Sequence, residues 1–200
     1  MEFVNNKTEI TNVDININIL IIFTHSSFYL SKFIYRTIFI NDYDKFKEEQ
    51  HFLNSDLFVS YGKIKNKTVK FIFQFVPLYN QYRWDLKRHL RKYLSRSDKY
   101  VYLLFYDSPF TFEESKRFYS EIIDVYRMLN IGDPISILVR YNYELVLDPN
   151  KEYVNEEEAL EYKDKNNLYF AHIGCTEKYE TGIKELLNTI FNKYIKKYNI

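Results

Sequence analysis

The sequence predicts an α/β domain in which helices cover both faces of a mainly parallel sheet. Near-continuous apolar runs alternate with amphipathic helical patterns, and strands buried on both faces are typical of parallel sheets. Two extended segments separated by a short turn add one antiparallel hairpin. The chain has 200 residues, 46% of them hydrophobic, which is enough for one buried core. We therefore expect a three-layer α/β/α domain over residues 15–198, with six strands and about five helices, after a flexible tail over residues 1–14.

The first half of the chain supplies the hairpin. Residues 15–23 form a β-branched run that predicts a buried strand, and residues 26–41 carry an apolar stripe at helical spacing. The hairpin strands are expected at residues 57–64 and 68–76. Lys65-Asn66-Lys67 separates them, and Pro77 ends the second strand.

The second half alternates helices with strands. Thr111 and Glu114 have the spacing of a capping box that opens a helix to about Asn130, with Leu129 in its buried stripe. Asn155 and Glu158 form a second such box. The expected elements are a helix at 82–96, a strand at 100–106, a helix at 111–130, a strand at 135–140, a helix from 155, a strand at 168–173 and a helix at 180–198.

Composition excludes several classes of function. The 28 basic and 27 acidic residues nearly cancel, so the overall charge indicates no nucleic-acid or membrane partner. Cys175 is the only cysteine, which excludes an intrachain disulfide and favours a reducing compartment. His172 lies three residues from it, but that spacing sends strand side chains to opposite faces. The stretch Ile15–Ser31 is too short and polar to span a bilayer, so we expect a cytoplasmic protein.

The layout resembles the small Ras-like GTPases, closest to the Rab and Rho branches, over residues 17–196. The strongest matches are scaffold segments: the strand 102–107 with the Ser-Pro-Phe-Thr-Phe-Glu-Glu that follows it, the strand around 134–139, and the helix start at 154–159. The resemblance implies the Ras-like G-domain fold, with a six-stranded, mostly parallel sheet and one antiparallel hairpin.

The phosphate-binding loop of that family is almost absent here. Its GxxxxGK[ST] motif would begin at Thr24, and Tyr29 and Leu30 replace its second glycine and its lysine. Only Ser31 matches. Glycine lets the backbone approach phosphates, and lysine offsets their charge, so efficient nucleotide binding is not expected.

The other nucleotide motifs are also lost. The DxxG motif reads Phe75-Val76-Pro77-Leu78, with Tyr79 where the family has its catalytic glutamine. The NKxD motif reads Tyr141-Asn142-Tyr143-Glu144, and no threonine lies between Thr37 and Thr68 to bind Mg²⁺. No C-terminal cysteine is present for a prenyl group. We therefore expect no catalytic residue and no metal site, and GTP hydrolysis is not expected.

Three hypotheses follow from the resemblance. The first is a pseudo-GTPase of the Rab/Rho type, a protein-binding module in membrane traffic or signalling. Its old nucleotide pocket would be filled by aromatic side chains: Phe28, Tyr29, Phe75 and Tyr79. The second is a slow switch that still binds GTP or GDP with Mg²⁺ weakly, through Ser26, Ser27, Ser31 and Glu144. The third is a non-catalytic subunit of a larger complex.

The helix at 82–96 is strongly basic. From Arg83 to Lys99, seven basic residues face two acidic ones. This is either a solvated surface or a site for an anionic partner: an acidic protein, a phosphoinositide membrane or RNA. In the resembled family this helix is a main partner-binding element, which favours a protein (effector, regulator or complex subunit) and not a nucleic acid. The proposed contacts are Arg83, Lys87, Arg88, Arg91 and Lys92. Near the end of the chain, Lys193, Lys196 and Lys197 would add a weak peripheral contact with endomembranes.

Overall fold

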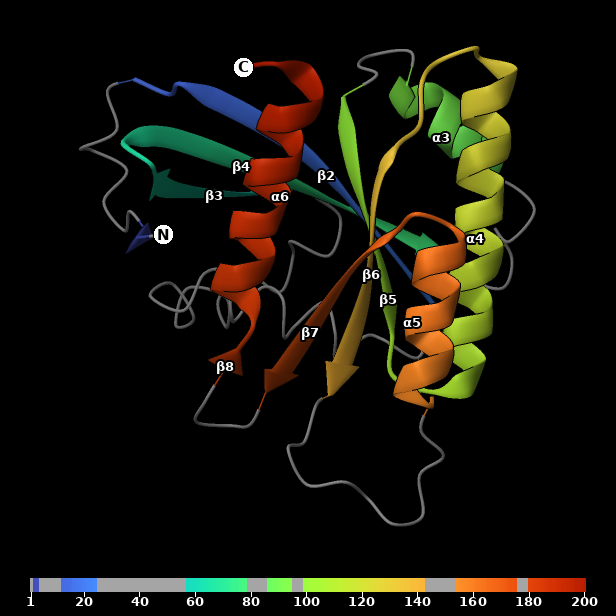
Figure 1. Ribbon diagram of the computed structural model, residues 1–200. Coiled ribbons are helices and arrows are strands. Elements are labelled where there is room, and N and C mark those ends of the chain that lie inside the picture. The colour runs from blue at the N-terminus through green and yellow to red at the C-terminus, as the bar shows by residue number, and fades with distance from the viewer. Residues whose placement is uncertain are drawn as a thin grey trace, which may run out of the picture.

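The computed structural model describes residues 2–3, 12–24, 57–78, 86–94, 99–142, 154–175 and 180–200 (Figure 1). The helix expected at residues 26–41 lies outside these ranges.

A mixed sheet forms the centre of the molecule, with the strand order β1-β3-β4-β2-β5-β6-β7-β8. The strands are β1 (Glu2–Phe3), β2 (Ile15–Thr24), β3 (Leu57–Ile64), β4 (Lys67–Leu78), β5 (Tyr100–Tyr106), β6 (Ile135–Asn142), β7 (Tyr169–Cys175) and β8 (Glu180–Thr181). β2 pairs in parallel with both β4 and β5, and the parallel ladder continues through β6 to β7. The six longer strands thus form a mostly parallel sheet with one antiparallel hairpin, as predicted.

Two short antiparallel strands at the edges of the sheet were not predicted. β1 pairs with Gly62 and Lys63 of β3, inside the segment expected to be a tail. β8 pairs with Gly174 and Cys175 of β7. The last helix was expected to include residues 180 and 181, and that boundary is wrong because these residues pair with β7 instead.

The hairpin turn consists of Lys65 and Asn66, which have φ values of 49° and 62°. Two consecutive positive φ angles are typical of the type I′ turn, whose twist matches that of the flanking strands. The prediction that Pro77 ends β4 is wrong, because Pro77 still pairs with Phe23 of β2. In the described ranges Gln74 is the last β4 residue that pairs with β3, so the described pairing of Pro77 is with β2 alone, and such a position tolerates the missing amide.

Four helices are described: α3 (Leu86–Leu94), α4 (Pro109–Met128), α5 (Glu156–Lys165) and α6 (Ile183–Tyr198). The capping box predicted at Thr111 and Glu114 is wrong. The N-cap of α4 is Ser108, Pro109 opens the first turn, and Thr111 completes the box with Ser108. For α5 the predicted N-cap Asn155 is confirmed, and its side chain accepts a hydrogen bond from the amide of Glu157.

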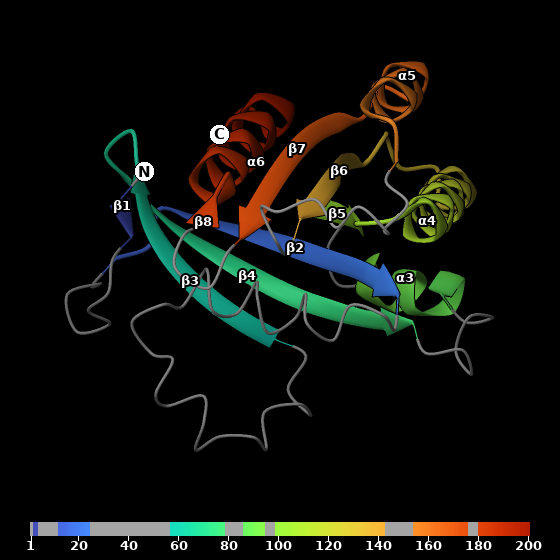
Figure 2. The same cartoon turned by 90° about the horizontal axis from the view of Figure 1, so that it is seen from below.

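Each face of the sheet has its own core. Along β2, the alternate residues Ile17, Ile19 and Ile21 pack in a cluster with α6. Leu20 and Ile22 point the other way, into a cluster with α3, α4 and α5. Strand residues alternate between faces, so one near-continuous apolar run supplies both cores. Figure 2 shows α6 and the α3–α4 pair on different sides of the twisted sheet.

Candidate functional site

The residues proposed to contact a nucleotide lie outside the described part of the chain. This applies to Ser26, Ser27, Ser31 and Glu144, and to the pocket-filling residues Phe28, Tyr29 and Tyr79. β2 is described up to Thr24, where the phosphate loop would begin, and β4 up to Leu78, where the segment aligned with DxxG would end. In parallel sheets, ligands bind beyond the carboxyl ends of such central strands. The structure therefore describes the two strand ends beside which such a site would lie, while the site and its proposed contacts remain predictions.

Backbone amides just after β5 are hydrogen-bonded to side chains at the start of α4. Thr111 Oγ1 accepts hydrogen bonds from the amides of Asp107 and Ser108, at 2.9 and 3.0 Å. Ser108 Oγ accepts from the Thr111 amide at 3.4 Å. These bonds cap α4 internally, so we infer that its N-terminus is a structural cap and not an anion site.

Three side chains form a row across the same edge of the sheet, on the face covered by α5. Tyr106 is paired in register with Arg140, and Arg140 with His172. Arg140 Nη1 lies 3.6 Å from Glu156 Oε2 in the first turn of α5, with 15% of the Arg140 side chain exposed. This row was missed at the level of sequence, because only the strand register brings the three residues together. The signal available was a lone arginine in an otherwise uncharged strand.

The pKa shifts in this row favour the neutral forms of His172 and Tyr106. Burial lowers the pKa of the His172 imidazole, and the neighbouring Arg140 guanidinium lowers it further, while Glu156 acts in the opposite direction. Burial raises the pKa of the Tyr106 phenol. At neutral pH the row is thus a neutral imidazole, a neutral phenol and a paired arginine. The Cys175 side chain lies outside the described part of the chain.

The basic helix is shorter than predicted in the described residues, and Arg83 lies outside them. α3 places Leu86, Leu90, Tyr93 and Leu94 in the core. This buried stripe forces the intervening side chains outward, and Arg88, Arg91 and Lys92 are exposed. No acidic residue occurs within α3 itself.

Two contacts fix part of this basic surface to α4. Lys87 Nζ lies 2.8 Å from Asp124 Oδ2, with 44% of each side chain exposed. Arg91 Nη2 donates to Met128 Sδ at 3.5 Å. The structure thus brings together four of the five proposed partner contacts on α3 and holds two of them, Lys87 and Arg91, against α4.

Exposed apolar side chains lie at the same place. Met128, which Arg91 contacts, is 61% exposed, and the adjacent Leu129 is 44% exposed. Leu129 was predicted to belong to the buried stripe of its helix. That prediction is wrong because α4 ends at Met128 and Leu129 is its C-cap. We call the combined set the α3 surface: Lys87, Arg88, Arg91, Lys92, Met128 and Leu129.

Other classes of site find no support in the described ranges. These ranges contain no group of three or more His, Cys, Asp or Glu side chains placed to hold a metal ion. None of the helices described has the length and apolar character needed to cross a membrane.

Comparison with known proteins adds no family assignment. No model of a known protein family matches the sequence, and no curated protein matches it significantly.

Proposed function

We propose that this chain is a pseudo-GTPase of the Rab/Rho-like type that binds a protein partner through the α3 surface, in membrane traffic or signalling. In this proposal the Ras-like domain serves as a scaffold without efficient GTP hydrolysis.

The fold supports the Ras-like part of the proposal. A mostly parallel sheet with one antiparallel hairpin and helices on both faces is compatible with that domain. Helix α4 begins with Ser108-Pro109, and β6 begins at Ile135, close to the positions where the resemblance expected them.

The sequence argues against a nucleotide switch. Phosphoryl transfer in the resembled family depends on positioning and electrostatic stabilisation by the phosphate loop. With Leu30 where the family has its lysine and Tyr29 where it has glycine, both contributions are missing. In this proposal the function is partner binding through the protein surface.

The observation that carries the partner proposal is the composition of the α3 surface. It combines four cations with two exposed apolar side chains on packed helices. Arginine and apolar side chains together are typical of protein interfaces, where arginine binds carboxylates bidentately. A partner segment that carries carboxylates and an apolar anchor would match this surface.

The test compares charge reversals on two helices. The immobilised protein, R88E/R91E and the control K163E/K165E are used to recover partners from the native source, with quantification by mass spectrometry. The control changes the charge equally, but on α5. We expect a partner retained by the wild type and the control and reduced at least tenfold with R88E/R91E, because each reversed charge opposes a carboxylate. Equal recovery with all three baits would contradict the proposal.

A further inference from the structure

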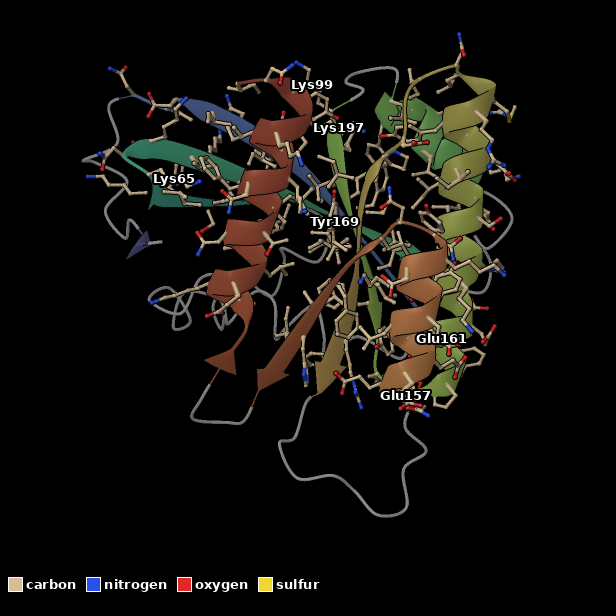
Figure 3. All side chains as sticks on the ribbon, viewed as in Figure 1. Lys65, Lys99, Glu157, Glu161, Tyr169 and Lys197 are labelled. Carbon is tan, nitrogen blue, oxygen red and sulfur yellow. The ribbon has the colours of Figure 1, made fainter. Side chains whose placement is uncertain are left out.

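The structure brings six lysines from distant parts of the sequence onto a second surface, around α6. Its members, here called the lysine face, are Lys65, Lys67, Lys99, Lys193, Lys196 and Lys197. All except Lys193 are exposed, and Lys193 is half-buried. Figure 3 labels Lys65 at the hairpin turn and Lys99 and Lys197 near the C-terminal end of α6.

Specific contacts join these segments. Lys65 Nζ donates to Asn192 Oδ1 of α6 at 2.9 Å, which fixes the hairpin turn beside the helix. Lys99 Nζ lies 5.2 Å from the centre of the Tyr198 ring, and Lys197 Nζ lies 5.7 Å from the same centre. Lys193 Nζ lies 3.9 Å from the centre of the Tyr169 ring. The hairpin, α6 and the start of β5 thus present their charges as one surface.

Within the described ranges few acidic groups lie close to this charge, and one of them is Glu2 of β1, which pairs in register with Lys63 of β3. β3 and β4 contain no aspartate or glutamate, and α6 contains only Glu185, in its first turn beside Lys184. Asp14 lies near the hairpin, where its Oδ2 accepts from the Thr68 amide at 2.6 Å. The formal charge of the whole chain is +1, so this concentration of lysine is a local property.

We propose that the lysine face binds an anionic membrane surface. This goes beyond the proposed protein-binding function, because it concerns a different surface and a different ligand. Acidic lipids attract spread lysines by a summed field that needs no pocket. The long lysine stems and the tyrosine rings beside them suit the interface between headgroups and acyl chains.

The chemistry favours a membrane over a nucleic acid. Among the described residues, β3, β4 and α6 contain no arginine, the residue that most often reads base edges. The rings of Tyr169 and Tyr198 already hold lysine ammonium groups, so they are poor platforms for base stacking.

The position of the face gives the bound molecule an orientation. α6 packs on one side of the sheet, and α3 with α4 on the other. A molecule bound through the lysine face would therefore present the α3 surface away from the membrane.

The test is cosedimentation with vesicles. The probes are vesicles of phosphatidylcholine alone and vesicles with roughly one-third phosphatidylserine. We expect binding to the anionic vesicles only, weakening as salt increases. In K67Q/K196Q/K197Q we expect about 100-fold weaker binding, since each lysine near the surface contributes about fivefold. The control R127Q/K163Q/K165Q removes the same charge from α4 and α5 and should bind as the wild type does.

Three outcomes would overturn the proposal. One is no binding of the wild type to anionic vesicles at low salt. Another is an equal loss in both variants, which would show a response to overall charge. The third is tight binding of a fluorescent RNA or DNA oligonucleotide that depends on the lysine face, without vesicle binding. Circular dichroism on both variants confirms that they are folded.

Discussion

Gly182, immediately before α6, shows how one residue sets the direction of a helix. Its φ is +89°, a conformation that side chains with a Cβ rarely adopt. A Cβ placed there would lie 2.1 Å from the carbonyl oxygen of His172. The chain can therefore turn from β8 into α6 beside β7 only with glycine at this position.

This close approach predicts a large effect of a single methyl group. Gly182→Ala should lower the free energy of unfolding by at least about 1–2 kcal/mol, because the left-handed conformation alone costs that much. Gly132→Ala is the matched control, since a Cβ there has no atom within 4 Å, and its effect should stay within about 1 kcal/mol. Urea unfolding followed by circular dichroism measures both. Equal stability of the two variants would contradict the geometry at Gly182.

His172 provides a second test at the same scale. We expect an imidazole pKa below 6.5, from burial and from Arg140. Arg140→Gln should raise this pKa and Glu156→Gln should lower it, because the two charges act in opposite directions. NMR titration of the imidazole protons measures all three proteins. Shifts of the same sign in both variants would exclude the arrangement described.

The sign of the associated stability change follows from the lowered pKa. The unfolded chain binds the His172 proton more readily than the folded protein does. Acidification from about pH 6.5 down through the folded pKa should therefore reduce the contribution of this residue to stability.

At the scale of the element, α3 has one buried face and one exposed face within a single short helix. Leu90 is fully buried against the sheet and α4, whereas Arg91, the next residue, is exposed. The inner residues hold the helix in place, and the outer residues belong to the α3 surface. Mutation can therefore separate the packing of α3 from its proposed role in partner binding.

Leu90→Ala should lower the free energy of unfolding by about 2–5 kcal/mol, since it leaves a cavity in the core. Arg91→Ala should change it by less than about 0.5 kcal/mol, because its only described contact is with an exposed methionine. Thermal or denaturant unfolding of both variants measures the difference. A destabilisation by Arg91→Ala as large as that of Leu90→Ala would show that the outer face is structural.

Elements also show which parts of the fold were predictable. Hydrophobic periodicity was enough to predict several elements: the strands β2, β5 and β6, from their apolar runs, and the helices α3 and α6, from their apolar stripes. The ends of elements could not be predicted in this way, because they depend on pairing with distant strands. Pro77 belongs to β4 because it pairs with β2, and residues 180 and 181 form a strand because they pair with β7. Leu129 has helical spacing, yet it is exposed because its helix ends before it.

The candidate sites were less predictable than the fold. The charge of α3 was visible in the sequence, but its neighbours Met128 and Leu129 were not associated with it. The row from Tyr106 to His172 depends on strand register. In the lysine face, Lys65 contacts Asn192, 127 positions away. Only the assembled fold brings such groups together.

At the scale of the whole molecule, the sheet separates two basic surfaces of different composition. The α3 surface combines arginine with exposed apolar residues, while the lysine face contains lysine and tyrosine. This division would suit the proposed scaffold, which would bind a protein on one side and an anionic membrane on the other. It does not require a nucleotide cycle.

The central claim is that this scaffold works without a guanine nucleotide. The most direct measurement is the nucleotide content of the purified protein, followed by titration of a fluorescent guanine nucleotide with and without Mg²⁺. We expect no bound GDP or GTP and no binding up to about 1 mM, an affinity of only about 4 kcal/mol. Stoichiometric GDP, or Mg²⁺-dependent binding below about 1 μM, would contradict the claim and indicate a divergent switch instead.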